Sequence, residues 1–264
     1  PASTRLTMPY RRVLSVVALL VLVYAGISAL LYFKQRDLIY YPSATTVAAS
    51  ETDFSLIQDG VTLRGWKLNP GQANALIYFG GNAERLESSR EQFTRLFPDR
   101  TVYLLPYRGY GASEGKPTET ALFGDALALY DAVHARHPSG DIAIVGRSLG
   151  SGVASYLASR RPVQKLVLVT PCDSRAEVPQ SHYCWRPGRW LISDADASRG
   201  SLRQYPGPLL VLRAGRDEVV PPVHTDRLIA SLQTPPVVVD FPLADHNDIS
   251  LQPRYDESLR DFLR

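Results

Sequence analysis

The chain has 264 residues, of which 45% are hydrophobic and 21% are charged. This length and balance suit one α/β domain with a large core, and they exclude a chain that is disordered over most of its length. The formal charge of +3 is small, and the sequence has no run of five or more basic residues and no interleaving of basic with aromatic residues. We therefore expect no nucleic-acid partner.

The first expected element is a membrane-spanning helix. Residues 13–33 form a stretch of 21 residues without a charged side chain. As a helix this stretch would be roughly 31 Å long, which matches the hydrocarbon core of a bilayer. Tyr24, Tyr32 and Tyr40 suit the membrane interface. Two alternatives are open: a signal peptide with a weak cleavage site near residues 26–28, and a buried core helix of a soluble domain.

The charges that flank this stretch indicate its orientation. Three arginines precede it, and two basic residues, partly offset by one aspartate, follow it (Arg5, Arg11 and Arg12; Lys34, Arg36 and Asp37). The positive-inside rule therefore predicts a cytoplasmic N-terminus and an extracytoplasmic location for the rest of the chain. If a signal peptide were cleaved, the same domain would be secreted.

The remainder of the chain reads as a hairpin followed by repeated strand-helix units. Strands are expected at residues 54–58, 61–68, 75–79, 101–105, 141–145, 165–170, 208–213 and 236–240, and helices at 83–97, 118–136, 151–158, 223–232 and 249–263. Asp59-Gly60 is a two-residue turn signal between the first two strands. Apolar strands separated by amphipathic helices indicate parallel strands buried on both faces. An antiparallel hairpin that leads into such a doubly wound, mostly parallel sheet is the α/β-hydrolase fold.

The interval 171–207 interrupts this alternation and contains no long periodic stretch. In the α/β-hydrolase fold a cap is inserted there, and 37 residues can hold only a short one, with one helix near 187–192 and a fairly open site beneath. In an oxidising compartment Cys172 and Cys184, within this interval, could form a disulfide, and the alternative is two unrelated buried thiols. Neither has histidine or aspartate neighbours with zinc-ligand spacing, so no metal is expected.

The segment Gly146-Arg147-Ser148-Leu149-Gly150 has the G-x-S-x-G spacing of a nucleophile elbow. It lies between an apolar strand and a helix rich in small residues, which is the context that the motif requires. A serine on such a sharp turn occupies a sparsely allowed backbone region, and the two glycines relieve the crowding around it. Ser148 is therefore the predicted nucleophile.

The base is predicted from the position of the histidines. A serine hydroxyl is a weak nucleophile until a base removes its proton, and a carboxylate must fix the tautomer of that base. His246 lies in a polar loop directly after the last strand, from which it can reach the carboxyl edge of the sheet. The other histidines lie at the end of a helix and are expected on the surface, or lie in the cap interval, or at a helix start (His134 and His137; His182; His224). We therefore predict His246 as the base, and its alternative is a surface loop histidine.

The acid is predicted from the order Ser, Asp, His along the chain. Asp217 follows the strand at 208–213, so its carboxylate is presented at the end of a buried strand. Asp173 is the alternative acid, because it follows the preceding strand and some hydrolases carry their acid there. Asp245 and Asp248 are expected to be turn and N-cap residues.

Two backbone N–H groups are predicted to form an oxyanion hole. One belongs to Leu149, which follows the nucleophile, and the other to Asn82, in the glycine-containing loop after the third strand. The alternative role for Asn82 is that of an N-cap, which is compatible with the first. The loop 109–115 does not have the dinucleotide-binding spacing and no Walker motif is present, so we expect no cofactor and a rigid loop beside the site. Arg147 is expected to pack or pair on the surface, with a role near the substrate as the alternative.

Five groups of residues carry a resemblance to a known family: Tyr78-Phe-Gly-Gly-Asn-Ala83, Pro106-Tyr-Arg-Gly-Tyr-Gly111 with Ser113-Glu-Gly115, the elbow, Gly215-Arg-Asp-Glu-Val-Val-Pro221 and Asp245-His-Asn247. Together they resemble the membrane-anchored α/β-hydrolase-domain proteins, or serine aminopeptidase-like hydrolases. The resemblance runs from about residue 35 to the C-terminus and implies Ser148 as nucleophile, Asp217 as acid and His246 as base. One departure is that such proteins usually have His-Gly-Asn where this chain has Gly80-Gly81-Asn82, so a side chain near the oxyanion loop is missing.

These observations predict a single-pass membrane serine hydrolase that cleaves an ester or thioester through an acyl-enzyme on Ser148. Residues 1–36 are expected to form the tail and anchor, and residues 37–264 the hydrolase domain. The expected partners are a small-molecule or acylated, lipid-like substrate and the lipid bilayer, contacted through residues 13–33. The alternatives are a peptidase or amidase with the same triad and a non-catalytic membrane-anchored binding protein. Retention of all three triad types in order argues against the binding protein.

Overall fold

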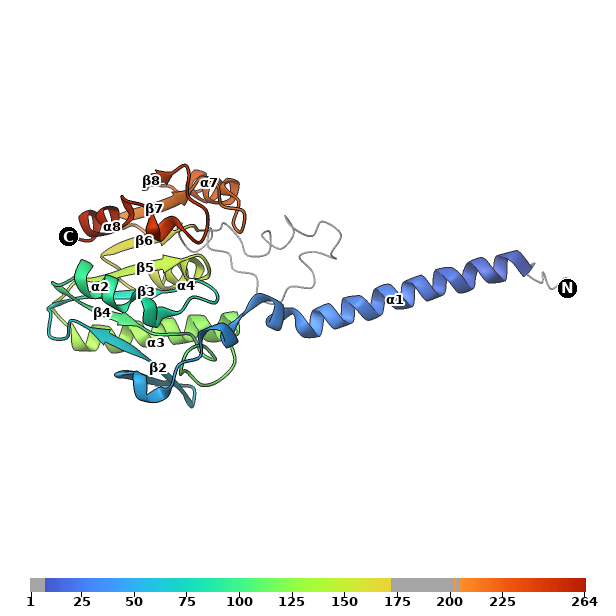
Figure 1. The fold of residues 1–264 in the computed structure, drawn as a ribbon, viewed down its shortest axis with the longest axis horizontal. Helices are drawn as coiled ribbons and strands as arrows, with labels where there is room; N and C mark the ends of the chain where they lie inside the picture. The colour runs from blue at the N-terminus through green and yellow to red at the C-terminus, as the bar shows by residue number, and fades with distance from the viewer. Residues whose placement is uncertain (1–7, 172–201, 203–204) are drawn as a thin grey trace.

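The structure is a computed structural model that describes residues 8–171, 202 and 205–264. A long helix, α1 (Met8–Ile39), projects from a domain built around one sheet (Figure 1). Within α1, Arg12–Leu30 is long and apolar enough to cross a membrane, and none of this window is buried in the structure. Leu22, for example, is 69% exposed. The alternative of a buried core helix is therefore wrong.

Within the described residues, the sheet has eight strands in the order β1-β2-β4-β3-β5-β6-β7-β8. Their bounds are β1 (Phe54–Gln58), β2 (Val61–Leu68), β3 (Asn74–Phe79), β4 (Arg100–Leu104), β5 (Ile142–Arg147), β6 (Lys165–Val169), β7 (Leu209–Ala214) and β8 (Val237–Phe241). β2 pairs antiparallel with β1 and with β4, and the other neighbouring strands are parallel. This topology confirms the predicted α/β-hydrolase fold and its N-terminal hairpin. Asp59 and Gly60 connect that hairpin with positive φ angles of 50° and 72°, as its two-residue turn requires.

Helices cover both faces of the sheet (Figure 1). The apolar side chains of α3 (Glu119–Arg136), α4 (Leu149–Ala158) and α7 (Pro222–Ala230) belong to one buried cluster. Those of α2 (Arg90–Leu96) and α8 (Tyr255–Leu263) belong to a second cluster. Short 3-10 helices complete the elements: Pro42–Thr45, Ala49–Glu51, Leu86–Ser89 and Ile249–Leu251. The central strands β3 to β7 are thus buried on both sides, as their continuous apolar sequences predict. The same expectation is wrong for the edge strand β8, in which Val237 and Val238 are exposed.

Two predicted helices are shorter than expected. The helix predicted at 83–97 begins as a 3-10 turn at Leu86, because residues 80–85 form a loop in which Ala83 has a φ of +59°. The helix predicted at 249–263 is divided into a 3-10 turn and α8, and Pro253 lies between them. Proline lacks the N–H that a continuous helix would use. The predicted cap helix near 187–192 lies outside the described residues.

Candidate active site

Ser148 lies on a strained turn between β5 and α4. Its φ of 50° and ψ of −112° are unfavourable for a residue with a side chain. The motif's two glycines allow close packing here: a Cβ at Gly150 would overlap the carbonyl group of Phe79, and a Cβ at Gly146 would lie 2.6 Å from the Cβ of Ala154. The G-x-S-x-G spacing therefore has the steric cause that its sequence context predicts.

Ser148, His246 and Asp217 are joined by hydrogen bonds. The Nε2 of His246 lies 2.9 Å from the Oγ of Ser148, and its Nδ1 lies 2.7 Å from the Oδ2 of Asp217. Each residue follows the carboxyl end of a different strand: β5, β8 and β7, respectively. Parallel strands end at one edge of the sheet, which is why residues far apart in the sequence meet here. The arrangement can move a proton away from Ser148 Oγ.

Asp217 is held by the turn in which it lies. Its Oδ1 accepts hydrogen bonds from the backbone N–H groups of Val219, at 2.9 Å, and Val220, at 2.7 Å. Asp217 is 5% exposed and His246 is 7% exposed. With Oδ1 occupied by two amides, Oδ2 faces the imidazole, and this arrangement favours the tautomer that has its proton on Nδ1.

The loop after β3 passes beside the nucleophile. A Cβ at Gly81 would lie 3.7 Å from the Cβ of Ser148, so the loop backbone approaches the elbow closely. The N–H of Gly81 donates to Glu84 Oε2 at 2.6 Å. Leu149 is the first residue of α4, in the turn where helix N–H groups have no partner within the helix. The two predicted oxyanion donors, Leu149 and Asn82, thus lie on segments that flank Ser148.

The side chain of Asn82 does not cap a helix, because the next helical turn begins only at Leu86. Its Oδ1 instead accepts hydrogen bonds from the hydroxyl of Tyr110, at 2.7 Å, and the backbone N–H of Tyr41, at 3.1 Å. Tyr110 belongs to the loop 109–115, whose glycines 109, 111 and 115 have positive φ angles. The loop 109–115 therefore contacts the loop after β3, which itself passes beside Ser148.

An ion pair that sequence analysis does not single out connects the site's loops. Arg147 Nη1 lies 3.2 Å from Glu84 Oε2, and only 14% and 12% of the two side chains are exposed. Burial alone would lower the pKa of Arg147, but Glu84 and nearby tyrosines raise it above its ordinary value. Tyr78 donates to Glu84 Oε1 at 2.7 Å, and burial together with this carboxylate raises the pKa of Tyr78. Arg147 therefore pairs as expected, but in a buried network rather than on the surface.

Of the other four histidines, the structure describes His134, His137 and His224. His134 is exposed, as predicted, but His137 is only 7% exposed, so its predicted surface position is wrong. His137 Nε2 lies 2.9 Å from the hydroxyl of Tyr103, which explains its burial at the end of α3. His224 is 4% exposed in α7. His182, together with Asp173, Cys172 and Cys184, lies outside the described residues.

Asp245 and Asp248 form a turn around His246. Asp245 Oδ1 accepts from the backbone N–H groups of Asn247 and Asp248, and Asp248 Oδ1 accepts from the N–H of Asp245. The hydrogen bond from the Asp248 amide, and to a smaller extent that from the Asn247 amide, lowers the pKa of Asp245. Asp248 precedes a 3-10 turn but caps it with no side-chain hydrogen bond. The turn role is therefore confirmed, and the expected capping of the last helix by Asp248 is wrong.

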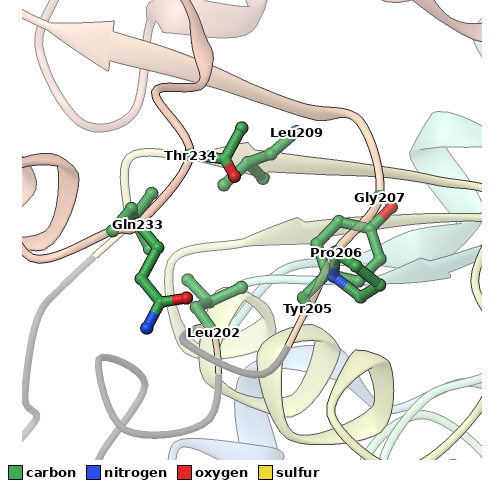
Figure 2. A pocket seen from close by; sticks show the side chains of 8 residues that line it. Leu202, Tyr205, Pro206, Gly207, Leu209, Gln233 and Thr234 are labelled. Carbon is green, nitrogen blue, oxygen red and sulfur yellow. The ribbon is translucent and has the colours of Figure 1, made fainter.

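A separate cavity of about 320 Å³ lies near the amino end of β7 (Figure 2). Leu202, Tyr205, Leu209 and Thr234 are among the residues that line this cavity. Ser148, Asp217 and His246 are not among them. In the part of the chain that the structure describes, no group of three or more histidine, cysteine or acidic residues could hold a metal ion.

The order and direction of the strands are those of the α/β-hydrolase fold. Residues 74–191 match the family model described as the α/β hydrolase fold, and the chain belongs to this family. It is 35% identical over 253 residues to an uncharacterized protein of Mycobacterium tuberculosis, covering 91% of this chain and 90% of that protein. It is 29% identical to an uncharacterized membrane protein of Saccharomyces cerevisiae, covering 89% of this chain and 90% of that protein.

Two further similar proteins are named as hydrolases, a lipase and an esterase. The lysophosphatidylserine lipase ABHD12 of Rattus norvegicus is 34% identical over 181 residues, which cover 61% of this chain and 45% of that protein. The fold is similar to that of an esterase from Pyrococcus furiosus, with a TM-score of 0.66, 18% identity, and coverage of 83% of this chain and 94% of the esterase. Family and relatives together support hydrolase activity, and the yeast relative and α1 suggest a membrane protein.

Proposed function

We propose that this chain is a single-pass membrane serine hydrolase that cleaves an ester or thioester through an acyl-enzyme on Ser148. One observation carries the proposal: the chain of hydrogen bonds from Ser148 Oγ through His246 to Asp217 at the carboxyl edge of the sheet. Such a chain activates a hydroxyl that is otherwise a weak nucleophile.

In the proposed reaction, His246 Nε2 takes the proton of Ser148 Oγ as that oxygen attacks the carbonyl carbon. The resulting oxyanion accepts hydrogen bonds from the N–H groups of Leu149 and Asn82. His246 then gives its proton to the leaving alcohol or thiol as the bond to the acyl carbon breaks. Water, activated by the same imidazole, releases the acid and restores the serine. Asp217 remains ionised and stabilises the imidazolium through its hydrogen bond to Nδ1.

The proposed substrate is an acylated, lipid-like ester. Helix α1 is apolar enough to hold the domain at a bilayer, where amphiphilic esters are concentrated. ABHD12, the relative from Rattus norvegicus, is named as a lipase of lysophosphatidylserine. These two observations favour an acyl ester of a polar headgroup over a fully water-soluble ester.

We further propose that residues 1–36 form the tail and anchor and residues 37–264 the hydrolase domain, with a short cap at 171–207. The positive charge before residue 13 is larger than the net positive charge just after residue 33. We therefore propose a cytoplasmic location for the N-terminus. Protease treatment of intact spheroplasts tests the orientation. Digestion of the domain is expected, and protection would reverse the proposed topology.

A fluorophosphonate probe tests the nucleophile on the full chain in detergent, with Ser148→Ala as the matched control. Labelling of the wild type alone is expected. Equal labelling of both proteins would place the nucleophile elsewhere, and labelling of neither would favour a binding protein.

The class of bond cleaved is tested with model substrates. Turnover of p-nitrophenyl acyl esters in preference to aminoacyl anilides is expected, and the reverse preference would indicate a peptidase or amidase.

A further inference from the structure

The segment that joins α1 to the first strand, residues 40–47, is packed onto the domain. We call it the junction segment. Tyr40 and Thr45 are each only 2% exposed. Tyr40 belongs to the hydrophobic core of the domain, so its expected position at the membrane interface is wrong. The Oγ1 of Thr45 donates to the carbonyl of Pro42, at 2.8 Å, and accepts from the N–H of Gly111, at 3.0 Å. The chain that leaves the anchor is therefore attached to the loop 109–115 before it enters β1.

The junction segment also contacts the oxyanion loop directly. The backbone N–H of Tyr41 is shared between Asn82 Oδ1, at 3.1 Å, and the hydroxyl oxygen of Tyr110, at 3.0 Å, and that hydroxyl donates to the same Asn82 oxygen at 2.7 Å. A second tyrosine of that region, Tyr107, donates from its hydroxyl to the carbonyl of Gly80 at 2.8 Å. The loop after β3 is thus held from outside at two points, one on each side of Gly81.

This loop requires such support for a physical reason. Its residue Ala83 has a φ of +59°, a backbone conformation that is unfavourable for a residue with a Cβ and persists only where the surroundings enforce it. Oxyanion donors act only when they are aimed in advance at the place where charge develops. A side chain fixed at Asn82 limits the rotation of the adjoining peptide, and that peptide carries the proposed donor.

We propose that the junction segment is a positioning element of the oxyanion hole, which acts through the side chain of Asn82. This inference rests on the proposed function and adds a second role to the anchor: the residues that follow α1 hold the catalytic loop as well as tethering the domain. Thr45 and Tyr110 are positioning residues, since each acts through Asn82 or through the junction and not on the substrate.

The test compares Thr45→Val with Thr45→Ser in the full chain in detergent, with a p-nitrophenyl ester as the probe substrate. Valine has the shape of threonine but cannot bond Gly111 or Pro42, whereas serine keeps the hydroxyl. Loss of one oxyanion donor reduces kcat about 100- to 1,000-fold, so misplacing one is expected to reduce it by about 10-fold. We expect that reduction in Thr45→Val, a KM within about twofold of wild type, and wild-type kcat in Thr45→Ser.

Two further variants probe Asn82 itself. Asn82→Ala keeps the backbone donor but loses the side-chain oxygen that accepts from Tyr41 and Tyr110. Tyr110→Phe removes one of these two donors and the hydroxyl that also accepts the N–H of Tyr41, but leaves the direct bond from Tyr41 to Asn82. We expect kcat to fall about 10-fold or more for Asn82→Ala, and by less for Tyr110→Phe. Hydrogen exchange of the amide at position 82 should accelerate in Asn82→Ala and Thr45→Val and remain at the wild-type rate in Thr45→Ser.

Two outcomes would overturn the proposal. The first is an unchanged kcat in Thr45→Val and Asn82→Ala, with only the thermal midpoint lowered, because a purely structural role would have that effect. The second is a kcat loss in Thr45→Ser equal to that in Thr45→Val. Ser148→Ala separates this proposal from the function itself: full activity in Ser148→Ala would refute the proposed function, whereas an inactive Ser148→Ala beside a fully active Asn82→Ala would refute only the positioning role.

Discussion

Arg147 Nη1 lies 3.2 Å from Glu84 Oε2 in a site where both side chains are almost wholly buried. Nη2 of the same guanidinium donates to the carbonyl of His246 at 3.2 Å. Since Glu84 also accepts the N–H of Gly81, one ion pair connects three segments: the loop after β3, the turn that carries Ser148 and the loop that carries His246. The pair can therefore fix the distances between the groups that the proposed reaction brings together.

Arg147→Met is expected to destabilise the domain strongly. It leaves the Glu84 carboxylate buried without its cation, and breaking a buried pair in this way costs about 3–5 kcal/mol. Urea unfolding of the full chain in detergent measures the loss. Arg161→Met is the matched control, because Arg161 pairs with Asp131 at 2.7 Å on the surface, with 32% and 54% of the side chains exposed. Its loss should be about 1 kcal/mol or less. Equal losses in the two variants would show that the Arg147 pair behaves as a surface pair.

Gly150→Ala is expected to prevent correct folding of the elbow. The added methyl group would overlap the backbone carbonyl of Phe79, and backbone atoms cannot move aside as a flexible side chain can. Gly124→Ala is the matched control, since a Cβ at Gly124, within α3, has no atom within 4 Å. That substitution should stabilise the protein by about 0.5–1 kcal/mol, because alanine is the better helix former. Thermal unfolding of both variants checks the contrast, which a stable, fully active Gly150→Ala would contradict.

Most of the fold could be predicted from the sequence because its central strands are short, continuous apolar runs, whereas its helices are longer and amphipathic. The continuous apolar strands and the Asp59-Gly60 turn fix the parallel sheet and its hairpin. The start of α2 could not be predicted in the same way. Ala83 is a favourable helix residue, yet its φ is +59°, a conformation that no local sequence signal indicates. The burial of His137 likewise depends on its contact with Tyr103, which is 34 residues away in sequence.

The candidate site also contains residues that the sequence predicts and residues that it does not. Ser148, Asp217 and His246 each follow a recognisable strand in a fixed order, so the topology of the fold predicts that they meet. Glu84 has no comparable signal. An acidic residue three positions beyond the loop glycine Gly81 is a weak clue, and its pairing with Arg147 depends on how two loops approach each other. The contact between Tyr41 and Asn82 joins residues 41 positions apart and follows no local pattern.

The loop of His246 is expected to lose stability in acid through Asp245. The amides of Asp248 and Asn247 hold the pKa of this carboxyl below its ordinary value. A pKa that is lower in the folded state adds stability above the unfolded value, about 3.9, and the contribution disappears as the pH falls through the folded pKa. Asp245→Asn keeps an acceptor oxygen but does not titrate. The difference in urea midpoint between wild type and Asp245→Asn should therefore shrink below about pH 4, and a difference that stays constant from pH 6 to pH 3 would contradict this account.

Asp217→Asn separates the proposed acid from its sequence alternative, Asp173. Asparagine at 217 can still accept from the amides of Val219 and Val220, so the turn should fold, but it cannot stabilise an imidazolium and it favours the wrong tautomer of His246. In a serine protease with the same triad logic, the corresponding substitution lowers kcat about 10,000-fold, and a loss of at least about 1,000-fold is expected here. Asp173→Asn should retain wild-type kcat on the same p-nitrophenyl ester. If Asp173→Asn were the inactive variant and Asp217→Asn the active one, the acid would belong after β6, and the hydrogen bond between Asp217 and His246 would serve only to hold the loop.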